Sequence, residues 1–372
     1  MPARRWCSEC LLLGESLDRG AVRAALDALG ADSVVLAGGA ARLRVHAHVG
    51  APQALFDACA GFGAVEGMKA DDMLLQSRSA GSRQAVAIVT DSAADLPEAV
   101  IQAHPLHVVP LRVNLDGRDY LDKVGLGTSA FYRRMAAARD LPRTSQPPPG
   151  DFRRVFEFLR AHHADVVYVG LSRAVSGTLQ SAEQAASRIE GGGVRAFDTV
   201  NAAGGQALLA WRAAELAASG ADAGTILREL QRLRPLTLTW AMARDIRHAV
   251  RGGRIPAWAA PAVRFSGLTP VARMRGDGTL GIAGGLRGLR GETCPAHGTE
   301  WRAALARDRR PLRCRGGRAT YARRPASSSR PGRIAPGRNG PAIGAHAGRG
   351  ALVVALQPAP TDEAGSAAEA SV

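Results

Sequence analysis

VAIVTDS, residues 86–92, decides the fold class, because an apolar run stops abruptly at three short polar residues. The same pattern recurs at residues 166–171, which end at Ser172, and at residues 194–197, which end at Asp198-Thr199. Each run is followed by a stretch rich in Ala, Glu and Gln that favours a helix. Such alternation is typical of a mainly parallel sheet that helices cover on both faces. We therefore expect an α/β domain over residues 84–284, with ligands at the carboxyl ends of its strands.

A smaller α/β module is expected upstream, in residues 1–80. The periodicity of the apolar side chains predicts two strands between two helices. They are a helix at 20–30, strands at 33–36 and 43–49, and a helix at 52–59. Residues 76–83, QSRSAGSR, have the composition of a linker and mark the expected boundary between the two domains.

The composition is that of a soluble α/β protein with two or three domains, because 46% of the 372 residues are hydrophobic and 5% are aromatic. The apolar runs are far shorter than the roughly 18 residues of a membrane span, so no transmembrane segment is expected. The opening MPARRWCSECLLLG is too interrupted for a secretory signal, which favours a cytoplasmic location. Five cysteines, an odd number, favour free thiols or metal ligands over a disulfide framework.

The formal net charge of +15 is concentrated in one segment. Residues 285–338 hold 14 arginines and three acidic residues, mixed with Pro, Gly and Ser and without a helix or strand period. Such a segment buries too little apolar surface to offset its chain entropy. The positive charge suggests a nucleic-acid-binding protein as the alternative. Because this charge is confined to one segment, however, no nucleic acid is expected as a partner. Order is expected again at 339–358, before a disordered tail at 359–372.

Five motifs resemble those of the DegV family of fatty-acid-binding proteins and follow the order of that family. They are VTDSAADLP at 89–97, TSQP at 144–147, LSRAVSGT at 171–178, FDT at 197–199 and GGRI at 252–255. The stretch GPAIGAHAG at 340–348 resembles the C-terminal motif of the family. The resemblance implies a two-lobed DegV-like fold with an acyl chain in an apolar tunnel between the lobes. The protein would then be a lipid carrier, not an enzyme, that presents the fatty-acid carboxylate to a partner fatty acid kinase.

The resemblance also identifies residues around the carboxylate. The hydroxyls of Thr144 and Ser172 are implied to donate hydrogen bonds to it. A backbone turn with a glycine can approach the head group closely. The residues expected at the carboxylate are Thr144, Ser172, Arg173, Ser176, Gly177, Arg254 and His346, with Asp91 and Ser92 as supporting residues.

Several of these residues have a second interpretation. Arg173 stands where the family has the second of two adjacent serines, and it either pairs with the carboxylate or points to solvent. Asp91 and Ser92 end a strand and either support an anion at the start of the next helix or simply cap that helix. His346 is either a head-group ligand or a hydrogen-bonded structural histidine.

Residues 1–80 resemble a different family, the dihydroxyacetone-kinase-like fatty acid kinases. VHAH at 45–48 and MLLQ at 73–76, with WCSE at 6–9, match the module that follows the nucleotide-binding domain of those kinases. That nucleotide-binding domain has no counterpart in this chain, so ATP chemistry would require a separate protein. A non-catalytic subunit of a dihydroxyacetone-like kinase is the alternative function.

Two histidines and two cysteines of this module are candidate zinc ligands. His46 and His48 lie two residues apart on an expected strand and so face the same side, while Cys7 and Cys10 form a C-x-x-C pair. The resemblance implies a set of two histidines, an early cysteine and a later cysteine that this chain lacks, so that Cys10 would replace the later one. The alternative is a loose C-x-x-C pair beside buried histidines without a metal.

The Arg-rich segment departs from the family pattern in sequence. The C-terminal motif nevertheless lies at about the distance expected if residues 285–338 were a normal part of the family's domain. Only two of the 48 basic residues are lysines, which indicates a GC-rich coding sequence. Such DNA yields Arg, Pro, Gly and Ala when it is read out of frame. We therefore interpret residues 285–338 as read in the wrong frame between two compensating indels, with a genuine disordered basic insertion as the alternative.

Overall fold

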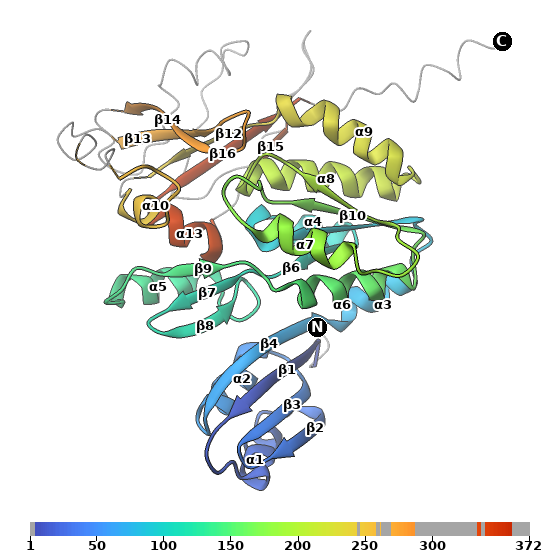
Figure 1. Cartoon of the computed structure of the whole chain (residues 1–372), viewed down its shortest axis with the longest axis vertical. Helices are drawn as coiled ribbons and strands as arrows, with labels where there is room; N and C mark the ends of the chain where they lie inside the picture. The colour runs from blue at the N-terminus through green and yellow to red at the C-terminus, as the bar shows by residue number, and fades with distance from the viewer. Residues whose placement is uncertain are drawn as a thin grey trace.

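The computed structural model describes residues 4–243, 246–257, 261, 269–286, 333–335 and 339–358. Figure 1 shows a small N-terminal module at one end of the long axis, a parallel sheet with its helices in the middle, and an antiparallel sheet at the other end. Most of the Arg-rich segment and the tail at 359–372 lie outside the described residues. The predictions of a wrong reading frame and of a disordered tail concern these residues. Within the described part of the chain no helix is long and apolar enough to cross a membrane.

The N-terminal module is a four-stranded antiparallel sheet in the order β2-β3-β1-β4. Its β3 strand alternates between buried and half-buried or exposed side chains, so one face packs on the helices and the other stays accessible. The predicted helices and strands are confirmed. The elements are β1 (Trp6–Leu13), α1 (Arg19–Ala28), β2 (Asp32–Gly39), β3 (Arg42–Val49), α2 (Pro52–Ala60) and β4 (Ala64–Asp72).

The predicted linker at 76–83 is wrong, because most of it belongs to the helix α3 (Met73–Ala80). The side chain of Asp72 accepts hydrogen bonds from the backbone amides of Leu74 and Leu75, which caps the helix. The composition of residues 76–83 suggested a linker because it is polar. In the structure, however, its serines and an arginine face other parts of the protein, and Ser79 is buried.

The parallel sheet that the sequence predicted is confirmed, with strand order β11-β10-β5-β6 and every neighbouring pair parallel. All six residues of β5 are buried, as expected of a central strand that helices cover on both faces. Helices α6 and α7 cover one face, where Phe152 and Phe156 pack on Tyr168, and burial of each phenyl ring contributes about 2 kcal/mol. Helices α4, α8 and α9 cover the other face.

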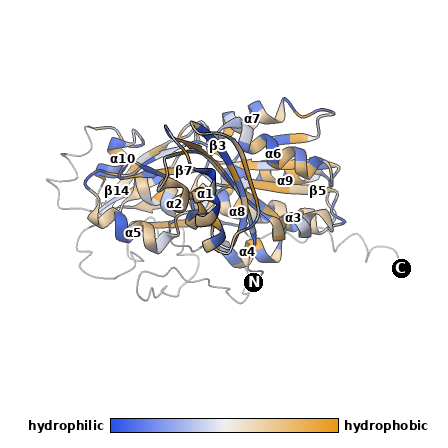
Figure 2. Ribbon diagram, turned by 90° about the horizontal axis from the view of Figure 1, so that it is seen from below, coloured by the Kyte–Doolittle hydropathy of each residue, from blue (hydrophilic) through white to orange (hydrophobic). Residues whose placement is uncertain are grey.

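In Figure 2 the strand β5 is largely hydrophobic, whereas α6 and α7 alternate between hydrophobic and hydrophilic residues. This difference is the one expected between an interior strand and a helix with one face in solvent. The elements of this layer are β5 (Val86–Asp91), the short helix η1 (Ser92–Ala94), α4 (Glu98–Ala103), β6 (Leu106–Val109), α6 (Pro149–Arg160), β10 (Asp165–Gly170), α7 (Thr178–Ala186), β11 (Val194–Asp198), α8 (Ala203–Ala218), α9 (Ala223–Leu233) and η2 (Arg234–Leu236).

Two antiparallel sheets, which the sequence analysis did not predict, complete the two lobes. A three-stranded sheet, β8-β7-β9, extends the first lobe beside α5, and a five-stranded sheet, β14-β13-β12-β16-β15, forms the second lobe with α10. Helix α13 packs against η1, α5, β7 and β9 of the first lobe and α10 of the second. The elements are β7 (Arg112–Leu115), β8 (Arg118–Leu121), α5 (Thr128–Ala137), β9 (Arg143–Ser145), β12 (Leu238–Met242), α10 (Arg247–Arg251), β13 (Thr269–Met274), β14 (Leu280–Leu286), β15 (Arg333–Ala335), α13 (Pro341–Ala347) and β16 (Leu352–Gln357).

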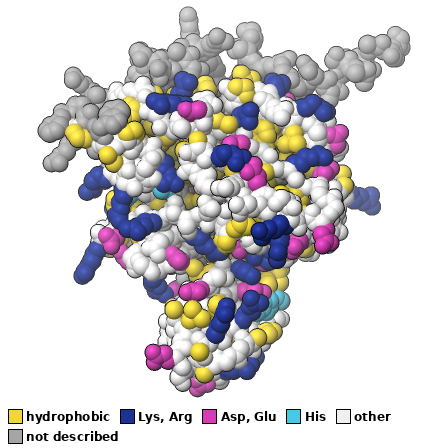
Figure 3. All heavy atoms as spheres, viewed as in Figure 1, with side chains coloured by type: hydrophobic (Ala, Val, Ile, Leu, Met, Phe, Trp, Pro, Cys, Tyr) yellow, Lys and Arg dark blue, Asp and Glu magenta, His cyan; other side chains and the backbone are white. Residues whose placement is uncertain are grey.

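Basic and acidic side chains are interspersed on the face of the molecule seen in Figure 3, without a continuous basic stripe among the described residues. Many of the basic groups are paired, as in the ion pairs Arg173–Glu183 and Arg232–Glu229.

Candidate functional site

An apolar cavity of about 140 Å³ lies between the two lobes, next to α13. Its walls consist mainly of alanines and larger aliphatic side chains from both lobes. The small alanines leave room where two sheets and a helix meet. The aliphatic lining residues are Leu111, Leu171, Val175, Ile246, Ile255, Met274, Leu280, Ile282, Ile343 and Val353.

Thr144 and His346 place a polar pair in this apolar wall. Thr144 Oγ1, on β9, lies 2.7 Å from His346 Nε2, on α13. Burial, together with the positive charge of Arg254 and the neighbouring His248, lowers the pKa of His346 to about 4. The ring is therefore neutral at pH 7, and its buried Nδ1 has no hydrogen-bond partner among the described residues.

The turn Gly252-Gly253-Arg254 closes the same end of the cavity. A Cβ atom at position 252 would lie 2.5 Å from His346 Nδ1, so only glycine permits this approach. The guanidinium of Arg254 donates to the carbonyl oxygens of Gly252 and, at 3.0 Å, of Val175. No acidic side chain among the described residues pairs with Arg254, and burial lowers its pKa. The polar end of the cavity therefore holds a cation whose charge no described carboxylate balances.

The structure brings four of the seven residues predicted at the carboxylate to the cavity: Thr144, Ser176, Arg254 and His346. Ser176 Oγ lies 2.9 Å from Thr178 Oγ1 and accepts from the amide of Thr178. Ser172 and Gly177 are not in the wall. The hydroxyl of Ser172 donates to the carbonyl of Gly278 in the β13–β14 turn at 2.9 Å, and Gly177 faces the side chain of Gln146.

Arg173 adopts the second of its two predicted arrangements. Its side chain is 53% exposed, and its guanidinium makes two hydrogen bonds to the carboxylate of Glu183 on α7. The arginine in place of a serine therefore lies on the surface beside the site and not in the cavity wall.

Asp91 and Ser92 connect backbone segments behind the cavity. Asp91 is fully buried and accepts from the hydroxyl of Tyr168, the amides of Ala93 and Leu171, and the side chain of Gln206. Burial raises the pKa of Asp91, against the lowering effect of these donors. The hydroxyl of Ser92 accepts from the amide of Leu111. Both residues thus cap and join elements, which is the second of their predicted roles.

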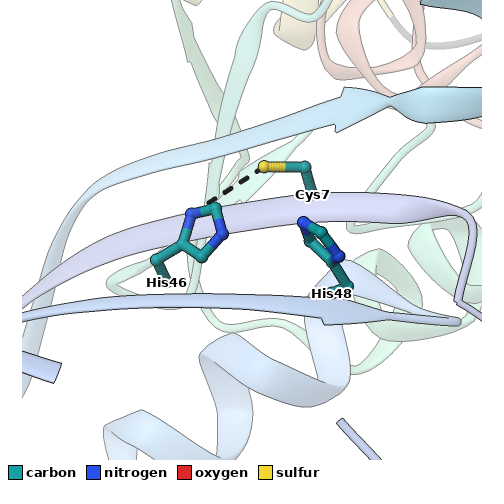
Figure 4. Close-up of side chains that lie close together, drawn as sticks. All are labelled: Cys7, His46 and His48. Carbon is teal, nitrogen blue, oxygen red and sulfur yellow. Dashed lines mark hydrogen bonds between the residues drawn. The ribbon is translucent and has the colours of Figure 1, made fainter. Parts of the chain in front are cut away.

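Three of the four predicted zinc ligands come together on the open face of the N-terminal sheet (Figure 4). Potential ligand atoms of Cys7, His46 and His48 lie within 4.8 Å of one another, and Cys7 Sγ is 3.9 Å from His46 Nδ1. Burial, together with the carboxylates of Asp71 and Glu9, raises the pKa of the Cys7 thiol to about 11. One thiol and two imidazoles are a donor set that fits zinc, with one position of a tetrahedron left over.

Cys10 is not part of this cluster, so the prediction of a C-x-x-C ligand pair is wrong. Both cysteines lie on β1, where residues three apart face opposite sides of the sheet. Cys10 is buried in the core of the module beside Cys59, whose thiol shares a hydrogen bond with it. The sequence analysis had not recognised Trp6–Leu13 as a strand, and that strand decides the direction of each thiol.

The family model described as "Uncharacterised protein, DegV family" matches residues 85–291, more than half of the chain. The chain belongs to the DegV family. Residues 3–80 match a second family model, which describes the middle domain of fatty acid kinase-like proteins. Both resemblances that the motifs indicated are thereby confirmed.

Curated DegV relatives share a part of this chain. A DegV domain-containing protein of Listeria innocua is 36% identical over 171 residues, which cover 46% of this chain and 60% of the relative. Protein DegV of Bacillus subtilis is 33% identical over 171 residues, which cover 46% of this chain and 61% of the relative. The chain thus spans about 60% of the length of the curated relatives it matches.

Solved DegV structures share the fold of both lobes. A DegV family protein from Thermus thermophilus that binds fatty acid has a TM-score of 0.59 at 26% identity, and the match covers 74% of this chain and 99% of that protein. DegV from Bacillus subtilis, a fatty acid binding protein, has a TM-score of 0.60 at 23% identity, with 74% and 100% coverage. At 23% identity, the likeness to the Bacillus subtilis protein shows the fold alone.

Proposed function

We propose that this chain binds a long-chain fatty acid, with the acyl tail in the apolar cavity and the carboxylate at Thr144, Ser176, Arg254 and His346. The observation that carries the proposal is Arg254, a half-buried cation at the end of an apolar cavity with no acidic partner among the described residues. A buried charge requires a counter-charge, and a fatty acid supplies one carboxylate followed by a purely apolar chain. The fatty acid binding of the Thermus thermophilus relative supports the same assignment.

The proposal divides the binding energy between tail and head. Each methylene removed from water contributes about 0.8 kcal/mol, which provides affinity without chemical selectivity. Each hydrogen bond from a hydroxyl or guanidinium to the carboxylate contributes about 1.5–3 kcal/mol and selects acids over other lipids. Ser172 acts beside this site by holding the β13–β14 turn, and Gly177 by admitting Gln146.

We further propose that the bound carboxylate is presented to a separate fatty acid kinase, and that this chain is a carrier and not the catalyst. The match of residues 3–80 to the middle domain of fatty acid kinase-like proteins supports a functional link to such a kinase. Phosphorylation of the carboxylate requires ATP, which places carrier and kinase together in the cytoplasm.

A comparison of two ligands tests the proposal. Delipidated full-length protein is titrated with palmitate and with hexadecanol, which has the same tail without the charge, and the dissociation constants are measured by calorimetry. We expect Arg254→Gln to weaken palmitate binding roughly tenfold to hundredfold and to leave hexadecanol binding unchanged. Arg251→Gln, an exposed arginine on α10, is the matched control. Equal affinity of the wild-type protein for both ligands would sink the proposal.

A further inference from the structure

Three charged side chains, Asp95, Asp122 and Lys123, lie together behind the cavity. Lys123 Nζ is 2.6 Å from Asp95 Oδ1 and donates to the backbone carbonyl of Ser92 at 2.8 Å. The side chain of Asp95 is 6% exposed, and Asp122 is fully buried. Charges are costly to bury unless they are paired and hydrogen-bonded, so this cluster requires a structural or functional reason.

The two carboxylates bind the beginning of α13. The amide of Gly340 donates to Asp95 Oδ1 at 2.9 Å, and the amide of Ala342 donates to Asp122 Oδ1 at 3.2 Å. These amides belong to the first turn, where backbone N–H groups have no partner within the helix and the helix dipole favours negative charge. A Cβ atom at position 340 would collide with the side chains of Lys123 and Asp95, so glycine is required for this close contact.

Helix α13 links these contacts at its beginning to the proposed head-group site near its end. His346 follows Ala342 by four residues, about one helical turn, and so lies on the same side of the helix. The hydroxyl of Tyr132 also donates to the carbonyl of Asn339, just before the helix. These contacts at its beginning fix the depth and rotation of the short helix together with its packing against both lobes, and both determine whether His346 Nε2 reaches Thr144 Oγ1.

We infer that Asp95, Asp122 and Lys123 are positioning residues for the carboxylate site: they hold the start of α13 and thereby keep His346 against Thr144. The inference rests on the proposed function, in which this pair binds the head group. The three residues touch neither the cavity nor its ligand, and they act only through the helix.

The test compares Asp122→Ala with Asp122→Asn, in which the amide oxygen can still accept from Ala342. The first readout is the ratio of palmitate to hexadecanol affinity, and the second is the titration of His346 followed by NMR. We expect Asp122→Ala to reduce the affinity ratio about tenfold, the loss of one hydrogen bond to a charged group. The pKa of His346 should rise from about 4 toward 6.5 as the ring becomes hydrated. Asp122→Asn should restore most of both values.

Further variants keep the inference open to refutation. Gly340→Ala disturbs the same contact from the side of the helix and should shift both readouts in the same direction, whereas the exposed Asp140→Ala should shift neither. The inference is overturned if Asp122→Ala lowers both affinities in parallel or leaves the titration of His346 unchanged. A wild-type protein without preference for palmitate refutes the proposed function alone, because the titration of His346 still reports its position.

Discussion

The register of two neighbouring strands brings together the side chains of Cys7, His46 and His48. In the antiparallel pair β1–β3, Cys7 lies directly opposite His48, and His46 is two residues further along the same face. His46 Nδ1 is also 3.2 Å from Glu9 Oε1, a carboxylate partner of the kind that orients metal-bound imidazoles. Side-chain chemistry and backbone register thus converge on one point of an otherwise polar sheet face.

We predict that this point binds zinc at about one ion per chain. A thiolate and two neutral imidazoles supply three of four tetrahedral ligands, and metal binding compensates the burial that otherwise keeps the Cys7 thiol protonated. Zinc content of the purified full-length protein is measured by mass spectrometry of the metal. Cys7→Ser should lower it at least tenfold, whereas Cys10→Ser, on the opposite face, should retain it. A wild-type protein without zinc after incubation with the ion would rule the site out.

At the scale of the elements, strands that are buried on both sides were the easiest part to predict. The apolar runs that became β5 and β10 are continuous and buried, and polar residues end them where the parallel sheet ends. The edge strand β11 was also predicted, although it includes the exposed Arg195. The short antiparallel strands of the first lobe were not predicted, because their side chains alternate only over short lengths. β7, β8 and β9 have four residues or fewer.

The candidate site could be predicted only as far as local motifs carry it. Thr144, Ser176, Arg254 and His346 were predicted together because each lies in a recognisable motif, and the fold does bring them to one cavity. The position of Ser172 depends on Gly278, more than 100 residues away, and that of Arg173 on Glu183 of the following helix, α7. The charged cluster beneath α13 was missed because Asp95 and Asp122 reach the helix across more than 200 residues.

The helix α3 is held by a pair of histidines, and this contact makes it sensitive to pH. Ser79 Oγ lies 2.9 Å from His107 Nε2 on β6 and 3.3 Å from His163 Nε2 beyond α6. His163 Nδ1 lies 2.8 Å from the carbonyl of Gln84, which fixes its proton on Nδ1. Burial, together with the nearby His163, lowers the pKa of His107 to about 4.

We predict that His107 makes the protein less stable in acid. The folded-state pKa lies below the unfolded value of 6.5, so this stability is present above pH 6.5 and is lost as the pH falls toward 4. The shift corresponds to about 3 kcal/mol over that range. Urea unfolding between pH 7 and pH 4.5 measures it: His107→Gln should lose less stability on acidification than the wild type, whereas His162→Gln, an exposed control, should match it. Parallel curves for wild type and His107→Gln would contradict the assignment.

In the whole molecule, the N-terminal module and the DegV lobes meet through several side-chain contacts, among them two arginines that reach β4. Arg154 on α6 pairs with Asp71 of β4 at 2.9 Å, and Arg112 on β7 donates to the carbonyl of Met68 at 2.7 Å. Both arginines also pair with Asp151, so one carboxylate joins the two contacts. Beside them lies a cavity of about 380 Å³ between the module and the lobes.

This second cavity separates the N-terminal module from the cluster of Asp95, Asp122 and Lys123. Asp122 and Lys123 form part of its wall and also belong to the cluster that holds the beginning of α13.

We predict that Arg154→Ala loosens the module from the lobes. The change leaves Asp71 without its cation in a partly buried interface and should cost about 2 kcal/mol, between the values for exposed and buried ion pairs. Cleavage at residues 81–85, the connection between α3 and β5, should become several-fold faster in limited proteolysis, because opening of the interface exposes it. Arg153→Ala, which removes only the exposed pair with Glu157, is the matched control and should cost less than about 0.5 kcal/mol. If both variants are cleaved at the wild-type rate, the arginine contacts do not hold the module against the lobes.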